Sequence, residues 1–287
     1  MGVGFVLVVL SLATFSNLSP VHPRFIVPNP DRNLVTSFSG QLLRAAQSSP
    51  RTKLRLRGGN ADSQQSRSDT SNHTNDICIR KPDIDKRSYR FLKLDNELEA
   101  VIISDNETHS GAAALCVGVG QLDDPPEVQG LAHFCEHMVF LGTERFPEES
   151  NFDQFCASCA GYSNAWTSMD HTLFHFIVAH DKLFETLDRF SAFFSCPLFS
   201  ESGTDREMHA VDSENNKNLQ DDDRREHQLM RSMCSPGHAM SRFGAGSYKT
   251  LHDLPAAAGV DVRAALLAFH GRFYSARAMR LSVIGRA

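Results

Sequence analysis

The chain has 287 residues, 41% hydrophobic and 22% charged, so it can bury a substantial core and is neither fibrous nor wholly disordered. Its net charge of −5 argues against nucleic acid or an anionic lipid surface as the main partner. Seven cysteines, an odd number without regular spacing, exclude a small disulfide scaffold.

Residues 1–23 carry no lysine, arginine or acidic residue, and Val3 to Phe15 is nearly all apolar. A run of this length fits the hydrophobic region of a signal peptide better than a membrane span, which needs about 20 apolar residues. No basic residue precedes the run, however, and no good cleavage site follows it. Two interpretations remain, a signal peptide for the secretory pathway and an apolar leader of a cytoplasmic protein, and we expect no stable membrane span.

Residues 24–85 are rich in Ser, Asn, Pro and Arg and have no sustained helical or strand period, which predicts a disordered leader and linker. The ordered domain should therefore cover residues 86–287. Its first elements should be strands at 89–94, 98–103 and 111–120. The third strand is small and apolar enough to be covered on both faces.

The remaining elements alternate between helical and strand patterns. We expect helices at 128–141, 151–160 and 181–195, one or two polar helices within 205–233 and a helix at 262–274, with strands at 162–168, 172–179 and 279–284. Strands come in pairs between helices. This order predicts an α+β domain in which helices pack on one face of a largely antiparallel sheet.

A metal-binding pattern lies inside the helix predicted at 128–141. His133 and His137 are four residues apart and share a helix face, and Glu136 stands beside them, so both imidazoles can reach one metal ion. The alternative is two ordinary histidines on one helix. Cys135, two residues after His133, points away from that face and is interpreted as a packing thiol.

Two histidines leave a tetrahedral zinc ion short of a protein ligand. Glu207 and Glu214 are seven residues apart on a predicted helix, so their side chains face the same way. One could bind the metal while the other holds a ligand imidazole in place. The alternative is chance, because a polar helix carries many acids at this spacing.

These residues resemble the insulinase or pitrilysin-type zinc metallopeptidases, the inverzincins, whose signature is H-x-x-E-H, and most of all their insulysin and nardilysin branch. The similarity continues through HFCEHMVFLGTERFPEE from His133, GYSNAWTS from Gly161, LDRFSAFFSCPLF from Leu187 and DREMHAVDSENNKN from Asp205. It covers about residues 86–286. The resemblance implies a pitrilysin-like N-terminal catalytic domain.

The resemblance also implies a role for each matching position. His133, His137 and Glu214 would bind one zinc ion, Glu136 would be the general base, and Glu207 would support the site from behind a ligand. Peptide substrates would pair with an edge strand, which consists of Ser163, Asn164, Ala165, Trp166 and Thr167. The alternative for that segment is an ordinary edge strand with a buried tryptophan.

Members of this family are far longer than 287 residues and consist of two halves that enclose a chamber. We therefore expect this chain to be a C-terminally truncated peptidase domain. Two functions stay open. The first is a zinc-dependent metalloendopeptidase that hydrolyses peptides, and the second is a catalytically incomplete zinc- and peptide-binding fragment that needs a C-terminal half as its partner.

Overall fold

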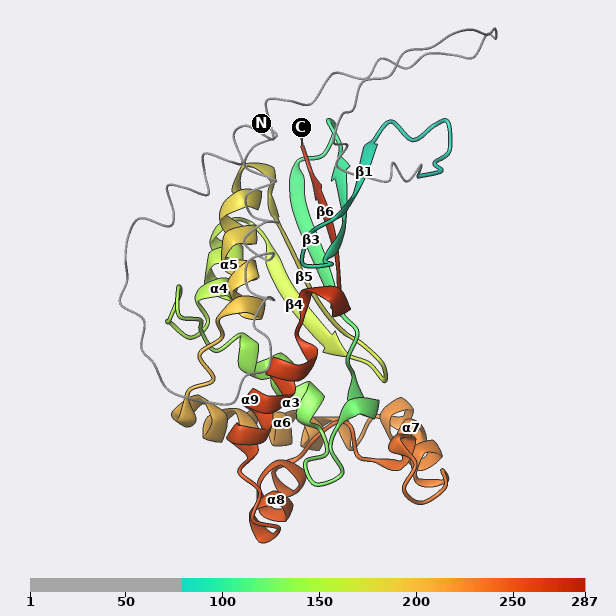
Figure 1. Cartoon of the computed structure of the whole chain (residues 1–287), viewed down its shortest axis with the longest axis vertical. Coiled ribbons are helices and arrows are strands. Elements are labelled where there is room, and N and C mark those ends of the chain that lie inside the picture. Colours follow the sequence, from blue (N-terminus) through green and yellow to red (C-terminus); the bar gives the residue numbers. More distant parts are fainter. Residues whose placement is uncertain (1–78, 287) are drawn as a thin grey trace, which may run out of the picture.

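A computed structural model of the chain describes residues 79–286, and within them one six-stranded sheet forms the centre of the domain (Figure 1). The leader predicted for residues 1–23 and most of the linker predicted for 24–85 lie outside the described residues. The strands are β1 (Ser88–Lys93), β2 (Glu99–Ser104), β3 (Ser110–Val117), β4 (Tyr162–Thr167), β5 (Thr172–Ala179) and β6 (Met279–Gly285).

The strands follow the order β1-β2-β6-β3-β5-β4. All neighbours are antiparallel except β2 and β6, which run parallel, with Val101 opposite Ser282. On its other side β6 pairs with β3, where Ala114 lies opposite the same Ser282. The last strand of the described chain therefore lies at the centre of the sheet, and β4 forms one edge.

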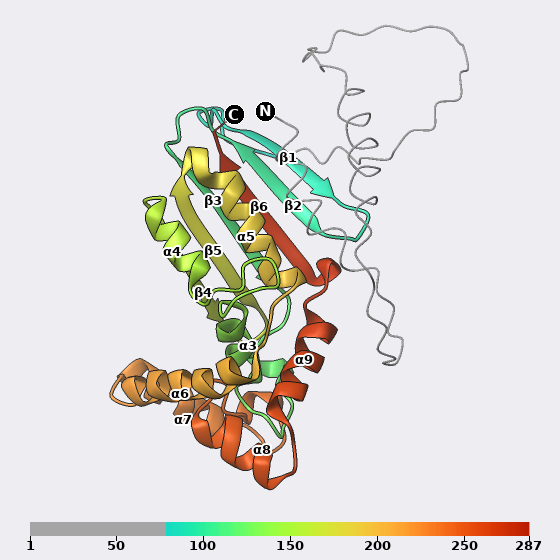
Figure 2. The same ribbon diagram turned by 90° about the vertical axis from the view of Figure 1, so that its left-hand side faces the viewer.

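Helices α4 (Asn151–Ser158) and α5 (Leu183–Ser195) cover one face of the sheet, as Figure 2 shows. The apolar face of α5, which consists of Leu183, Leu187, Phe190 and Phe194, is buried, and the Phe190 ring contacts Phe176 of β5 with centroids 5.2 Å apart. Phe152 of α4 lies 5.9 Å from both rings. This aromatic cluster fixes the helical layer on the sheet.

Among residues 79–286, no element covers the other face of the sheet at β3, so the predicted coverage of both faces is wrong for this part of the chain. Ala113, Leu115 and Val117 are buried against the helices, whereas Ala112 and Ala114 on the opposite face are only partly buried. The small apolar residues of β3 predicted a strand covered on both faces, but the helices within residues 79–286 cover only one of them. The α+β architecture with a largely antiparallel sheet and helices on one face is confirmed.

Five further helices gather at one end of the sheet (Figure 1). They are α3 (Leu131–Val139), α6 (Glu201–Asn218), α7 (Asp222–Ser232), α8 (Leu254–Ala257) and α9 (Val262–Phe273). The polar segment predicted to form one or two helices within 205–233 therefore forms two, α6 and α7. The chain breaks between them at the N-cap of α7, where the Asp221 carboxylate accepts a hydrogen bond from the Arg224 amide at 3.0 Å. Within residues 79–286, no helix combines the length and the apolar character that a membrane span requires.

Candidate metal centre

Helix α3 is positioned by a buried carboxylate that lies outside the helix itself. Asp124 is 1% exposed and accepts hydrogen bonds from the backbone amides of Gly130 and Ala132, both at 2.7 Å. These are amides at the start of α3, which have no partner within the helix. The buried side of α3 includes Phe134, Cys135 and Met138, so its remaining side faces a cleft with the two histidines. Cys135 is fully buried, as its predicted packing role requires.

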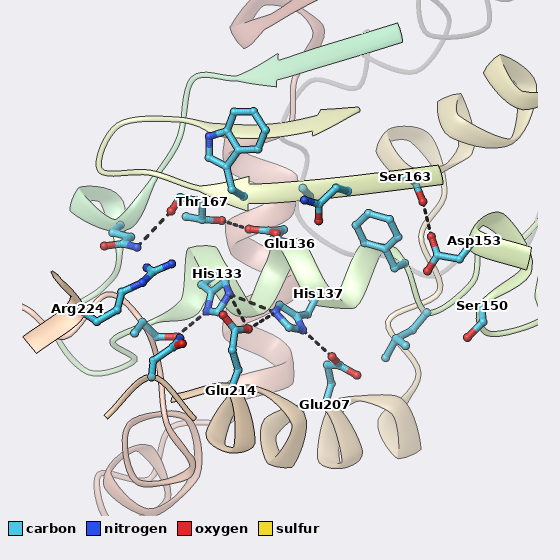
Figure 3. Close-up of a pocket in the computed structure, with 18 residues that line it drawn as sticks. His133, Glu136, His137, Ser150, Asp153, Ser163, Thr167, Glu207, Glu214 and Arg224 are labelled. Carbon is cyan, nitrogen blue, oxygen red and sulfur yellow. Dashed lines mark hydrogen bonds and ion pairs between the residues drawn. The ribbon is translucent and has the colours of Figure 1, made fainter. Parts of the chain in front are cut away.

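The structure brings His133 and His137 of α3 together with Glu214 of α6 (Figure 3). The two Nε2 atoms are 3.2 Å apart, and Glu214 Oε2 lies 3.6 Å from the first and 3.3 Å from the second. Ligand atoms about 2.0–2.1 Å from a tetrahedral metal ion stand about 3.3 Å from one another. The three donor atoms therefore have the spacing of a tetrahedral metal site.

Both imidazoles are held through their Nδ1 atoms by acceptors on other elements. His137 Nδ1 donates to Glu207 Oε1 at 2.7 Å, and His133 Nδ1 donates to the backbone carbonyl of Ala245 at 2.6 Å. These contacts leave Nε2 of each ring as the nitrogen that faces Glu214 and can bind a metal ion once it carries no proton. The two glutamates on α6 that the sequence could not assign thus lie differently, since only Glu214 lies close to both Nε2 atoms.

The electrostatics of the cluster follow from burial and from these contacts. Burial lowers the pKa of His137, but the hydrogen bonds to Glu207 and Glu214 outweigh it and raise that pKa to about 9. The bond to His137 lowers the pKa of Glu214 to about 2, and burial lowers the pKa of His133. The cluster thus offers an anionic carboxylate beside two aligned imidazoles, and a divalent cation bound there would take the place of the proton that His137 holds.

Glu136 lies next to the donor atoms but is not one of the clustered ligands. Its side chain is largely buried, and its Oε2 accepts a hydrogen bond from the Thr167 hydroxyl at 2.5 Å. Burial raises the pKa of Glu136 to about 7, against the opposing effect of that hydrogen bond. A carboxylate with a pKa near neutrality can both accept and release a proton.

The edge strand β4 forms one wall of the cleft, which measures about 660 Å³ and is lined by Ser163, Asn164, Ala165, Trp166 and Thr167 together with the metal cluster. Trp166 is 46% exposed, so the alternative of a buried tryptophan on this strand is wrong. Ser163 donates a hydrogen bond to Asp153 of α4, which fixes one end of the strand. The outer backbone edge of β4 has no neighbouring strand among the described residues.

Three groups in this cleft were absent from the sequence-based prediction. The Ala245 carbonyl holds His133, the Gln121 amide donates to the Thr167 carbonyl at 3.3 Å, and Arg224 of α7 lines the cleft. Residue types in a sequence do not reveal a contact that is made by a backbone carbonyl, although the glycines at positions 244 and 246 indicate a loop there.

Comparison with known proteins agrees with this geometry. A profile of the insulinase family, peptidase family M16, matches residues 99–237. A crystal structure of pitrilysin matches the fold with a TM-score of 0.70 and 33% sequence identity, over 74% of this chain and 22% of that protein. The fold is pitrilysin-like. Residues 99–237 form part of a domain of the insulinase family.

Two relatives give the extent of the similarity. The A-factor-processing enzyme of Saccharomyces cerevisiae is 47% identical over 218 residues, which are 76% of this chain and 21% of that enzyme. The insulin-degrading enzyme of Homo sapiens is 49% identical over 208 residues, which are 72% of this chain and 20% of that enzyme. This chain therefore spans about a fifth of the length of the relatives it matches.

Proposed function

We propose that this chain carries the catalytic site of a zinc-dependent endopeptidase that hydrolyses peptides. The observation that carries the proposal is the cluster of His133, His137 and Glu214, whose donor atoms have tetrahedral spacing. Two imidazoles and one carboxylate are the ligand set of many hydrolytic zinc sites, in which the fourth position is left for water. The proposed stoichiometry is one zinc ion per chain.

A zinc ion in such a site lowers the pKa of a bound water and polarises a carbonyl group. The proposed role of Glu136 is to take a proton from the attacking water and return it to the departing amine, which its burial and its pKa near neutrality support. Glu207 holds the His137 imidazole through Nδ1, so that Nε2 is directed toward the metal site. Thr167 fixes the rotamer of Glu136 through its hydroxyl.

The proposed substrate is an extended peptide that adds a strand to the free edge of β4. Strand addition uses the backbone groups of residues 163–167, so it accepts many sequences but requires an unfolded segment. The strand ends at Thr167, whose hydroxyl contacts Glu136, and a paired peptide would therefore pass the proposed base. The relatives named as insulin-degrading and A-factor-processing enzymes support peptides as the substrate class.

A second function rests on a separate observation. The chain spans about a fifth of its relatives' length, and Glu214 is 41% exposed at the rim of the cleft. A half-open site positions a substrate poorly and admits water freely. The alternative is therefore a zinc- and peptide-binding fragment that cleaves peptides only together with a C-terminal half.

The test measures zinc and peptide cleavage separately on the whole chain. His137→Ala should lose the zinc ion, whereas Glu136→Gln should keep it, because an amide preserves shape but cannot take a proton. Cleavage of a quenched fluorescent peptide should fall about 100-fold or more in Glu136→Gln and stay at the parental level in Glu144→Gln, a control at an exposed site. A zinc-free parent, or full activity of Glu136→Gln, contradicts the proposal, and zinc without any cleavage favours the fragment.

A further inference from the structure

We infer that the loop of residues 243–248, called the clasp loop below, is a positioning element that orients His133 for metal binding. The inference rests on the proposed zinc site and concerns residues on neither ligand helix. The clasp loop acts through the backbone carbonyl of Ala245, and its position depends on the contact between Gly246 and Gly130.

The contact between Ala245 and His133 fixes one state of the imidazole. A carbonyl oxygen can only accept, so Nδ1 of His133 must carry the hydrogen of the 2.6 Å bond, and Nε2 keeps its lone pair. For His137 the acceptor at Nδ1 is the Glu207 carboxylate instead. The two ligand histidines thus have acceptors of different kinds, and that of His133 is a backbone atom 112 residues away in sequence.

The clasp loop is tied to both helices that carry the proposed ligands. At one end the Phe243 amide donates to Oε1 of Gln129, just before α3, at 2.7 Å. At the other end the Tyr248 amide donates to Oδ1 of Asp212, on α6, at 2.8 Å. Asp212 lies two residues before Glu214. The loop therefore bridges the helix with the histidines and the helix with the carboxylate.

Two glycines let the clasp loop approach α3 closely. Gly246 has φ +80° and Gly130 has φ +93°, conformations that favour glycine. A Cβ on Gly130 would lie 2.3 Å from the Gly246 Cα, and a Cβ on Gly246 would lie 3.1 Å from Val211 Cγ1 and 3.2 Å from Leu251 Cδ1. A methyl on Gly246 therefore has to displace the loop or these two side chains by a few tenths of an ångström. Displacement of the loop weakens the hydrogen bond to His133, which depends steeply on distance and angle.

A matched pair of variants separates this positioning from backbone strain. Gly246→Ala adds a methyl at the crowded position, whereas Gly237→Ala adds one at φ +84° with nothing within 4 Å. Both variants place an alanine in the left-handed conformation, which costs a similar conformational free energy in each. We expect the zinc dissociation constant of the full chain to rise about 10- to 100-fold in Gly246→Ala and to stay within about twofold in Gly237→Ala.

The measurements are competition with a chromogenic chelator and the visible absorption spectrum of the Co²⁺-loaded chain. The Co²⁺ bands should change in Gly246→Ala, because the His133 ligand tilts, and stay parental in Gly237→Ala. Parental zinc affinity and spectrum in Gly246→Ala, or equal weakening in Gly237→Ala, overturn the inference while the zinc site stands. A parent that binds no zinc overturns the proposed function, and the inference with it.

A second variant keeps the test decisive if Gly246→Ala does not fold, as judged by circular dichroism. Gln129→Ala removes the acceptor of the Phe243 amide without adding any atom. It should weaken zinc binding about 3- to 10-fold, because one of the loop's two hydrogen-bonded anchors is lost. Unchanged affinity in a folded Gln129→Ala chain contradicts the inference equally.

Discussion

His270 should make the described domain less stable in mild acid. This residue lies on α9 between two rings, with centroids 5.2 Å from Phe199 and 4.6 Å from Tyr274. Its Nε2 atom is buried and has no hydrogen-bond partner among the described residues. Burial lowers the pKa of His270 from 6.5 to about 4, so the folded domain holds the neutral ring.

The sign and size of the effect follow from proton linkage. Below pH 6.5 the unfolded chain gains a proton on His270 while the folded chain does not, so stability is lost as the pH falls and the loss continues to about pH 4. Between pH 7 and pH 5 this one group should reduce the free energy of unfolding by about 2 kcal/mol. His270→Phe removes the titration and keeps a ring in the same space.

Urea unfolding at pH 7 and pH 5 measures this contribution. The parent should lose about 2 kcal/mol more than His270→Phe over this interval, and the other titrating groups cancel in the comparison. His227→Gln, at an exposed position on α7, controls for the loss of one histidine and should behave as the parent. An equal loss in the parent and in His270→Phe refutes the linkage argument.

Three further predictions concern the metal centre. Glu207→Gln should weaken zinc binding about 10- to 100-fold, because an amide holds the His137 imidazole less strongly than a carboxylate does. Chelator competition measures the zinc affinity, and Asp205→Asn, at an exposed site on the same helix, is the control. An unchanged affinity in Glu207→Gln contradicts the prediction. Asp124→Ala should reduce the unfolding free energy in urea by about 2–4 kcal/mol, because two buried amides at the start of α3 lose their acceptor; a loss within about 0.5 kcal/mol, typical of a surface site, would refute that role. Addition of a C-terminal half from the same locus should restore fast peptide cleavage if the chain alone is slow, and chelator-sensitive activity of the chain alone at the level of a complete family member would contradict the need for it.

Local patterns predicted most of the elements because each has a face that must be buried. The 4-3-4 spacing of Leu183, Leu187, Phe190 and Phe194 predicted α5 to within two residues, and the strand pattern of residues 172–179 predicted β5 with its observed bounds. Such local patterns could not predict the order of the strands in the sheet. Nothing local to residues 279–285 indicates that they pair with β2 and β3, since pairing of distant strands is decided by the packing of the whole domain.

The candidate site was likewise predictable only where local sequence determines the geometry. The i, i+4 spacing of His133 and His137 places two imidazoles together through helix geometry alone, so the sequence was sufficient for that half of the cluster. Which glutamate of α6 lies beside their Nε2 atoms depends on how α6 crosses α3, and from the sequence only the resemblance selected Glu214. The Ala245 carbonyl was inaccessible to such reasoning, because any residue could supply that oxygen.

The central position of β6 has a consequence for how the domain folds. Strands β1 and β2 on one side and β3, β5 and β4 on the other are joined in the sheet only through β6, which begins at Met279. During synthesis, the whole metal cluster leaves the ribosome while the sheet is still two separate pieces with open edges. Non-local pairing of this kind is slow and exposes aggregation-prone strands. The sheet that supports the metal centre is thus complete only when a strand that begins 65 residues beyond Glu214 has been inserted.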